Sequence, residues 1–242
     1  MLTLARDLRR RKARERTGAF VAEGVRAVEE LLRSSLEVRG ALVSPALGDA
    51  PVRAALAEHG VPITEVDEQA FATAADTESP QGVLAIAAVP ERGVGDIPTV
   101  GRVLALDGVQ DPGNVGAIIR SAAAFGIAAT IALPGTVDLW NAKVVRSAMG
   151  AHFVHLAFAA PWEALDGFRG ASGMPLWAAD AHGAPIGGSY PDRLLLVVGN
   201  EGNGLSAEAR ARADRLVSIP VRQVESLNVA VATGILLYEL RA

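Results

Sequence analysis

The stretch RVLALDGVQDPGNVGAIIRSAAAFG, residues 102–126, decides how the chain folds. Its apolar run up to Leu106 is typical of a strand buried on both faces, and the apolar spacing after Asn114 predicts a helix over 114–125. A polar turn joins the two, where a parallel strand would have its carboxyl end. Ligands of open α/β folds bind at that edge, so this turn is a candidate binding loop.

The same alternation continues to the end of the sequence. We expect strands at 103–109, 128–133, 152–158, 175–180, 194–199 and 215–219, and helices at 114–125, 140–148, 161–168, 206–212 and from about Ser226. Strands such as LLLVVG at 194–199 are continuously apolar. They predict an α/β fold whose sheet is mostly parallel, with helices on both faces.

The first ninety residues predict a smaller α/β domain. We expect helices at 3–15, 25–34, 51–60 and 68–75, and strands at 20–24, 38–44, 61–66 and 82–89. The following segment 91–101 is rich in Pro and Gly and has no apolar period, which is typical of a linker. The expected domains are therefore 1–90 and 102–242.

Composition excludes several kinds of chemistry. The 242 residues include no cysteine, which rules out disulfides, thiolate zinc sites and cysteine nucleophiles. His152 and His155 would face opposite sides of the expected strand, so we expect no bound metal. No apolar run approaches the ~20 residues of a membrane helix, and no signal core follows the first basic residues. We therefore expect a soluble, cytoplasmic protein without a membrane partner.

Positive charge gathers at the amino terminus, although the formal net charge is −4. Residues 1–20 hold seven basic and two acidic residues. Such a segment suits phosphate contacts, and a solvated helix face is an equally good explanation from charge alone.

Three loops that follow strands carry polar residues. The first, DPGNVGAIIR, is neither a dinucleotide fingerprint nor a P-loop; Asn114 could simply cap the helix, and Arg120 could reach solvent along its apolar stem. The second, VVGNEGNGLS at 197–206, has glycines that let the backbone approach a ligand, and Glu201 could be turn chemistry. In the third, Ser226 and Asn228 precede a nearly uncharged helix, and Ser226 could cap it. Three such loops at sheet edges favour one shared site over three independent caps.

These loops resemble the SpoU (TrmH) family of RNA ribose 2′-O-methyltransferases, within the SPOUT superfamily. Asn114 and Arg120 fit the family's N-x-G-x-x-x-R, and the segments GNEGNG at 199–204 and SLN at 226–228 fit its second and third motifs. The segment DLWNAKVVRSAMGAHF at 138–153 supports the match, and RKARERTGAFVAEG at 11–24 resembles the family's ribosomal-protein-like RNA-binding domain more loosely.

The resemblance implies a deep trefoil knot, a homodimer with the site near the subunit interface, and S-adenosylmethionine as cofactor. It implies these catalytic residues: Asn114, Arg120, Glu201, Ser226 and Asn228. The cofactor would lie against Gly199, Ile219 and Leu227. RNA contacts are expected from Arg9, Arg10, Arg11, Lys12, Arg14 and Arg146. The third motif, IPVRQVESLN at 219–228, lacks the family's usual glycine and is one residue shorter, which leaves the backbone contacts of 222–225 open.

The expected reaction is methyl transfer to a ribose 2′-hydroxyl of RNA, ribosomal RNA before transfer RNA. In-line alignment can supply up to ~7–11 kcal/mol of the barrier. The resemblance implies Arg120 as general base, yet a guanidinium holds its proton far above neutral pH. We therefore favour Arg120 as a clamp on the neighbouring phosphate that also stabilises the developing oxyanion.

Other functions remain alternatives at this point. An oxidoreductase on a doubly wound sheet is disfavoured because the first strand lacks G-x-G-x-x-G. A non-catalytic RNA-binding protein of ribosomal type would need only the first domain. Pyrimidine base methylation is disfavoured because that route uses a cysteine nucleophile.

Overall fold

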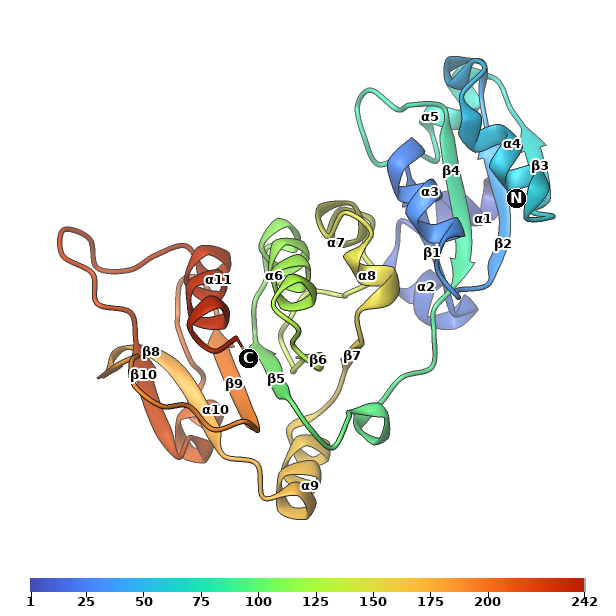
Figure 1. Cartoon of the computed structure of the whole chain (residues 1–242). Coiled ribbons are helices and arrows are strands. Elements are labelled where there is room, and N and C mark those ends of the chain that lie inside the picture. Colours follow the sequence, from blue (N-terminus) through green and yellow to red (C-terminus); the bar gives the residue numbers. More distant parts are fainter. Residues whose placement is uncertain (242) are drawn as a thin grey trace. The chain divides into compact units, whose positions relative to one another are not determined.

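The computed structural model of the chain describes residues 1–241, which divide into two compact units (Figure 1). The first comprises residues 1–91 together with 140–154, and the second comprises the rest. This division differs from the sequence-based boundary, which put 140–154 in the second domain.

The first unit is a small α/β fold on a four-stranded sheet. Its strands are β1 (Ala19–Glu23), β2 (Val38–Val43), β3 (Ile63–Glu65) and β4 (Val83–Ala88), in the order β1-β4-β2-β3. β4 is antiparallel to both neighbours, and β2 is parallel to β3. Its helices are α1 (Leu2–Asp7), α2 (Arg11–Thr17), α3 (Val25–Leu32), α4 (Pro51–Glu58), α5 (Glu68–Ala72), α7 (Ala142–Ser147) and α8 (Ala151–Val154), with the short η1 (Pro45–Leu47).

Aromatic packing explains why 140–154 belongs to this unit. The ring of Phe20 on β1 lies 4.4 Å from that of Trp140 and 5.9 Å from that of Phe153, measured between ring centroids. All three side chains are buried. Large aromatic side chains bury much apolar area, so this cluster holds α7 and α8 against β1.

The second unit is built on a six-stranded parallel sheet. Its strands are β5 (Arg102–Asp107), β6 (Ala129–Ala132), β7 (Ala157–Ala159), β8 (Leu176–Pro185), β9 (Leu194–Gly199) and β10 (Arg215–Ser218), in the order β10-β8-β9-β5-β6-β7. Every neighbouring pair is parallel, as the sequence predicted. Its helices are α6 (Pro112–Ala124), α9 (Trp162–Ser172), α10 (Ala207–Arg212) and α11 (Val229–Glu239), with the short η2 (Val94–Asp96).

Both faces of this sheet are covered. Val103 and Ala105 of β5 belong to a core cluster with Trp162 and Leu165 of α9 and Ala209 of α10. Successive strand residues point to opposite faces, so the buried Leu104 and Leu106 lie on the other side. Figure 1 shows α6 and α11 side by side on that second face, where they pack on each other. Helices α9 and α10 thus cover one face of the sheet, and α6 and α11 cover the other. This arrangement confirms the prediction made from the continuously apolar strands.

Three expected elements differ from the structure. The helix expected at 3–15 is two helices, because the buried Arg14 donates to the carbonyls of Leu8 and Arg9 and fixes a turn between them. The strand expected at 152–158 is α8 followed by β7, since His152 and Phe153 pack in a helix. The segment expected to be a linker contains η2 and the buried Ile97, which packs in the core of the second unit.

Candidate active site

The first two candidate loops meet at the carboxylate of Glu201. β5 and β9 are parallel neighbours, so the loops that follow them leave the same edge of the sheet. Glu201 accepts hydrogen bonds from the backbone amides of Gln110 and Asp111, both at 3.1 Å, and from Nδ2 of Asn114 at 3.0 Å. The second loop therefore holds the first turn of α6 in place.

Hydrogen bonds also keep Glu201 ionised. Burial opposes its ionisation, but the bonds from the Asn114 side chain and from backbone amides outweigh burial, and the pKa of Glu201 lies below its usual value. A carboxylate with a lowered pKa is a weak proton acceptor. The geometry thus fits Glu201 for holding the loops rather than for accepting a proton.

Asn114 joins the third loop to this pair. Nδ2 of Asn228 donates to Oδ1 of Asn114 at 3.1 Å. Because a carboxylate can only accept, the amide nitrogen of Asn114 must face Glu201 and its oxygen must face Asn228. A continuous chain of side-chain hydrogen bonds, Glu201–Asn114–Asn228, therefore connects the three loops.

The helix caps differ from the expected ones. Asp111 caps α6, accepting from the amide of Asn114 at 2.8 Å, and Pro112 takes the first helical position. Asn228 caps α11 through bonds from the amides of Ala230 and Val231, at 2.9 and 3.2 Å. The alternative explanation of Asn114 and Ser226 as helix caps is thus wrong. The side chain of Asn114 instead bonds to Glu201 and Asn228.

The second loop is a tight turn folded against the end of β9. Asn200 and Gly204 exchange two backbone hydrogen bonds, and Oδ1 of Asn200 accepts from the amides of Gly202 and Asn203 at 2.9 Å. A Cβ atom on Gly199 would lie 2.4 Å from the carbonyl atoms of Gly204. Glycine is required at 199 because the backbone turns directly over it.

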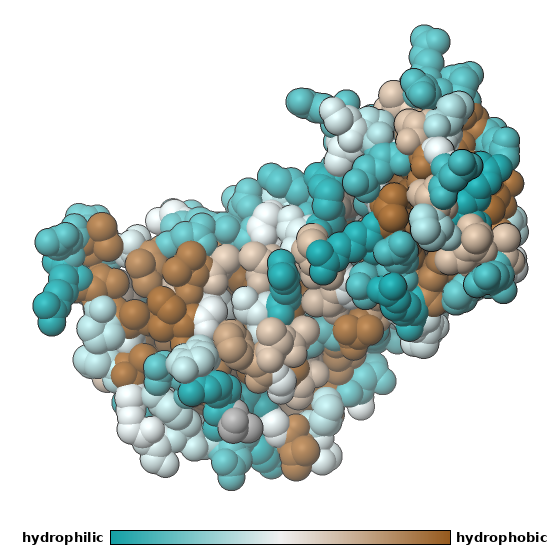
Figure 2. All heavy atoms as spheres, turned by 45° about the horizontal axis from the view of Figure 1, so that its top comes forward, coloured by the Kyte–Doolittle hydropathy of each residue, from teal (hydrophilic) through white to brown (hydrophobic). Residues whose placement is uncertain are grey.

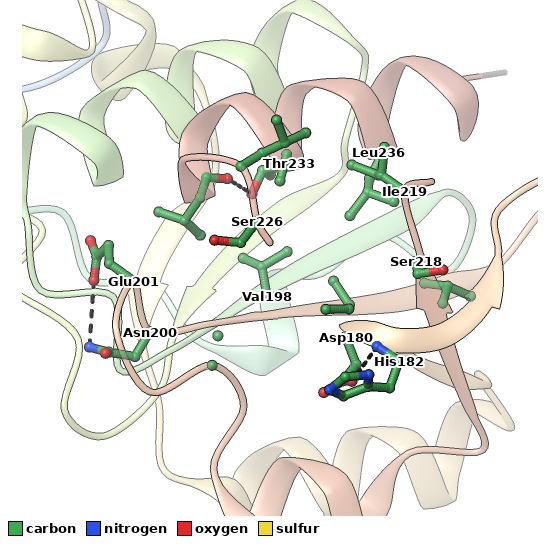
Figure 3. A pocket seen from close by; sticks show the side chains of 18 of the residues that line it. Asp180, His182, Val198, Asn200, Glu201, Ser218, Ile219, Ser226, Thr233 and Leu236 are labelled. Carbon is green, nitrogen blue, oxygen red and sulfur yellow. Dashed lines mark hydrogen bonds between the residues drawn. The ribbon is translucent and has the colours of Figure 1, made fainter. Parts of the chain in front are cut away.

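A cavity of about 610 Å³ opens beside this turn (Figure 3). It is lined by residues 179–182, 198–204, 217–221 and 225–227, together with Arg210, Val229, Ala232, Thr233 and Leu236. Ligand pockets typically have volumes of ~300–1,000 Å³. The three residues expected to contact a cofactor, Gly199, Ile219 and Leu227, all line the cavity, as do Glu201 and Ser226.

Sequence reasoning missed several polar residues of this cavity, among them Asp180, His182 and Arg210. Asp180 and His182 come from β8, and Arg210 comes from α10. Asp180 stands at the end of the strand expected at 175–180, and a polar residue at the carboxyl end of a buried strand was the available signal.

Three of the expected catalytic residues, Asn114, Asn228 and Arg120, are not among the residues that line the cavity. Asn114 and Asn228 are nevertheless linked to the cavity-lining Glu201 by hydrogen bonds, whereas Arg120 lies on α6 six residues beyond Asn114 and is exposed. Within residues 1–241 its guanidinium has no hydrogen bond or ion pair. Asn114, Glu201 and Asn228 are therefore connected in one chain, with Ser226 in the adjoining cavity and Arg120 apart.

The expected RNA-contact residues all lie in the first unit, and their exposure differs. Arg9, Arg10, Arg11 and Lys12 are exposed. Three of the expected residues form ion pairs: Arg10 with Asp7, Arg11 with Glu15 at 2.7 Å, and Arg146 with Asp76 at 3.2 Å. Arg14 is only 5% exposed and bonds to backbone carbonyls, which corrects its assignment to RNA contact. Its charge serves the turn between α1 and α2.

The two buried histidines, His152 and His155, make packing and hydrogen-bond contacts within the core. Nε2 of His155 lies 2.8 Å from Oγ1 of Thr130, and burial together with the charge of Arg92 lowers the pKa of His155 to about 4. His152 packs edge-on against Trp140. Among residues 1–241, no group of acidic, His or Cys side chains is arranged to hold a metal ion. In the same part of the chain, every helix is too short or too polar to cross a membrane.

Two family models match the chain. Residues 101–238 match the model described as SpoU rRNA Methylase family, and residues 4–85 match the model described as MRM3-like substrate binding domain. The two matches together span nearly all of the sequence.

Named relatives match over almost their full lengths. The 23S rRNA (guanosine(2553)-2′-O)-methyltransferase RlmP of Bacillus subtilis is 36% identical over 239 residues, which cover 98% of this chain and 94% of that protein. The structure is similar to an AdoMet-bound rRNA methyltransferase from Sinorhizobium meliloti, with a TM-score of 0.85, 31% identity and coverage of 98% and 92%. It is also similar to the SpoU methyltransferase AviRb from Streptomyces viridochromogenes in complex with AdoMet, with a TM-score of 0.87, 30% identity and coverage of 98% and 95%.

Proposed function

The chain belongs to the SpoU rRNA methylase family, and on this premise we propose that it transfers a methyl group from S-adenosylmethionine to a ribose 2′-hydroxyl of ribosomal RNA. The observation that carries the proposal is the chain of hydrogen bonds Glu201–Asn114–Asn228 beside the cavity. It gives the three matching loops one shared geometry. The 2′-hydroxyl distinguishes RNA from DNA, so the activity is specific for RNA.

The cavity fits S-adenosylmethionine in size and in chemistry. Val198, Ile219 and Leu236 supply apolar surface for a purine ring, and Gly199 and Leu227 bring backbone groups to the wall. The carboxylate of Glu201 in the wall suits a ligand that carries a positive sulfonium. S-adenosylmethionine supplies an activated methyl group, whose bond to sulfur breaks as the bond to the ribose oxygen forms.

The chain's own residues act by positioning. Asn114 and Asn228 present amide groups beside the cavity, held by Glu201 and by the first turn of α11. With Ser226 they orient the target ribose, and alignment of this kind accounts for a large share of methyl-transfer catalysis. Arg120 binds the phosphate next to that ribose and stabilises the developing oxyanion, while the proton of the hydroxyl passes to water.

A homodimer would explain the position of Arg120. Val231, Ile235 and Tyr238 recur at helical spacing on α11 and are 38–53% exposed, and Val221 and Val224 of the preceding loop are exposed as well. Figure 2 shows apolar surface gathered over this side of the second unit. Exposed apolar surface of this kind marks an interaction site. Since α6 packs along α11, pairing through α11 brings Arg120 to the subunit boundary.

Tyr238→Glu tests the dimer. A buried unpaired charge is costly at an interface, so the variant should sediment as a monomer where the wild type sediments as a dimer. A wild-type monomer at micromolar concentration would contradict the proposal. Glu58→Gln, an exposed change in the first unit, is the control.

The finer features of the fold are proposed on the same premise. The loops 200–204 and 219–228 line one cavity although β10 lies at the far edge of the sheet, which is consistent with a carboxyl-terminal trefoil knot. The first unit, with residues 1–90 as its main part, is proposed as a ribosomal-protein-like RNA-binding domain. Its contacts with phosphate come from Arg9, Arg10, Arg11, Lys12 and Arg146. A ribosomal RNA substrate places the activity in the cytoplasm.

Methylation of purified RNA tests the proposed function. The protein is incubated with unmodified ribosomal RNA, with transfer RNA and with labelled S-adenosylmethionine, and 2′-O-methylated positions are mapped by resistance to alkaline cleavage. We expect one ribosomal RNA position that is absent with an Asn114→Ala variant. Labelling of transfer RNA alone would contradict the assignment of ribosomal RNA as the substrate. Labelling of neither RNA would contradict the proposed methyltransferase activity.

A further inference from the structure

β8 breaks its pairing with β10 beside the cavity. Leu216 of β10 pairs with Ala178, but the next residue, Val217, pairs with Ala184. Residues 179–183 of β8 therefore bulge out opposite a single peptide bond of β10. Four of them, 179–182, line the cavity, and bulges next to binding sites commonly re-aim a side chain.

The bulge is held rigidly. A Cβ on Gly183 would lie 2.6 Å from backbone atoms of Leu216 and Val217, so only glycine lets the strand rejoin its partner there. Oγ of Ser218 donates to the carbonyl of Gly183 at 2.8 Å. Within the bulge, Oδ1 of Asp180 accepts from the amide of His182 at 2.9 Å. The direction of the Asp180 side chain is thus fixed before any ligand binds.

The carboxylate of Asp180 is buried and charged, and only some of its hydrogen-bond acceptor positions are occupied. Its side chain is 5% exposed, and its second oxygen pairs with Nη2 of Arg210 at 2.5 Å. Burial opposes ionisation, but the bonds from His182 and Arg210 outweigh it and lower the pKa of Asp180. A carboxylate has about four acceptor positions and no donor. Two positions are filled, so the rest can accept from hydroxyl or ammonium groups in the cavity.

The surroundings favour the adenosyl half of a ligand at this end. Figure 3 shows Asp180 and His182 at one end of the cavity with Ile219 and Leu236 facing them, and Glu201 at the opposite end. An apolar slot suits a purine, and the group attached to a purine in S-adenosylmethionine is a ribose with two neighbouring hydroxyls. An acidic side chain on ribose hydroxyls is a common solution in nucleotide-binding folds.

We propose that Asp180, held by Arg210 and by the β8 bulge, accepts hydrogen bonds from the ribose hydroxyls of bound S-adenosylmethionine. This inference rests on the proposed function, since it takes that cofactor to be the occupant. It makes Asp180 a binding residue that selects a ribonucleoside, distinct from the Glu201–Asn114–Asn228 chain at the other end.

Binding measurements test this without catalysis. Isothermal titration calorimetry compares S-adenosylhomocysteine with its 2′-deoxy and 3′-deoxy analogues on the wild type and on Asp180→Asn. A hydrogen bond to a charged group predicts about a 10- to 100-fold weaker Kd for at least one deoxy analogue on the wild type. Asp180→Asn should bind S-adenosylhomocysteine correspondingly weakly and should lose most of the discrimination between the three ligands.

A matched control separates this effect from general loosening. Asp166→Asn removes a carboxylate that also pairs with an arginine, Arg212, at 3.0 Å, but Asp166 does not line the cavity. It should bind all three ligands as the wild type does. The wild-type comparison needs no substitution, so the test stands even if Asp180→Asn folds poorly.

A second ligand distinguishes the ribose from the amino-acid end. 5′-Methylthioadenosine keeps the ribose hydroxyls but lacks the ammonium group, so Asp180→Asn should weaken it by about the same factor as S-adenosylhomocysteine. Weakening of S-adenosylhomocysteine alone would overturn the ribose assignment. Equal affinities on wild type and Asp180→Asn would overturn any binding role for Asp180. Failure of the wild type to bind S-adenosylhomocysteine would instead reject the proposed function.

Discussion

Asn114→Asp isolates the hydrogen bond on which the three loops depend. The substitution keeps the shape of the side chain but replaces Nδ2, which lies 3.0 Å from Oε1 of Glu201, by a second carboxylate oxygen. A hydrogen bond to a charged group contributes ~1.5–3 kcal/mol, and the new like-charge contact adds ~1 kcal/mol where water screens it well. We expect a loss of about 2–4 kcal/mol in transition-state stabilisation, which lowers kcat/KM by roughly 30- to 900-fold at pH 7.5.

The pH dependence gives this prediction its sharpest readout. Two adjacent carboxylates cannot both ionise freely, so they share a proton and the upper apparent pKa of the pair rises above the ordinary carboxyl range. Below that pKa the shared proton restores a hydrogen bond between positions 114 and 201, and the bond is lost as the pH rises through it. In the wild type the pKa of Glu201 is lowered instead, so the bond persists down to acid pH.

The assay is single-turnover methyl transfer to ribosomal RNA from pH 5.5 to 8.5, expressed as the ratio of variant to wild type. That ratio should rise as the pH falls. Asn141→Asp is the control, because Asn141 caps α7 by accepting from the amide of Lys143 and aspartate caps equally well. An Asn114→Asp enzyme within threefold of the wild type at pH 7.5, or a ratio independent of pH, would refute the reasoning.

Three further substitutions test other parts of the structure. Arg120→Lys keeps the charge but loses the two-pronged guanidinium, so turnover should fall at least tenfold with unchanged affinity for S-adenosylhomocysteine, and near-normal turnover would reject the phosphate clamp. Gly199→Ala places a methyl group 2.4 Å from the carbonyl of Gly204, so calorimetry should detect little or no S-adenosylhomocysteine binding; wild-type affinity would show that the turn can move aside. Phe153→Ala removes a fully buried ring from the cluster around Phe20 and should cost ~3–5 kcal/mol in denaturant unfolding of the first unit, whereas Val154→Ala, at an exposed position, should cost little.

The fold was largely predictable because its strands are coded by local apolar runs. β9 matches the expected strand 194–199 residue for residue, since LLLVVG is buried throughout. The errors arose where tertiary contacts override local pattern. HFVHLAF alternates like a strand, yet Phe153 gains more by stacking on Phe20 from a helix. One continuous helix was expected at 3–15, and the buried hydrogen bonds of Arg14 divide it into α1 and α2.

The site was predictable where the loops carry motifs, and less so elsewhere. Gly199, Ile219 and Leu227, predicted as cofactor contacts, all line the cavity although the third motif is shortened, and their contact with the cofactor stays a prediction. Asp180 was missed because its role depends on a register break between β8 and β10, and pairing register is a property of two strands that neither sequence displays alone. Arg120 was expected among the other catalytic residues. The structure places it on α6 without a hydrogen bond to any of them.

The direction of the hydrogen-bond chain bears on how the site treats a hydroxyl. Amides at the start of α11 donate to Asn228, which donates to Asn114, which donates to the carboxylate of Glu201. Each amide oxygen is engaged as an acceptor, while each side-chain nitrogen has two N–H groups and a single hydrogen bond within residues 1–241. The chain therefore offers donors to a ribose, and donors stabilise an oxyanion but cannot remove a proton. Because the side chains offer donors and the lowered pKa makes Glu201 a weak base, the site favours catalysis by alignment and by stabilisation of negative charge. Arg120 is permanently protonated and can contribute to the same stabilisation.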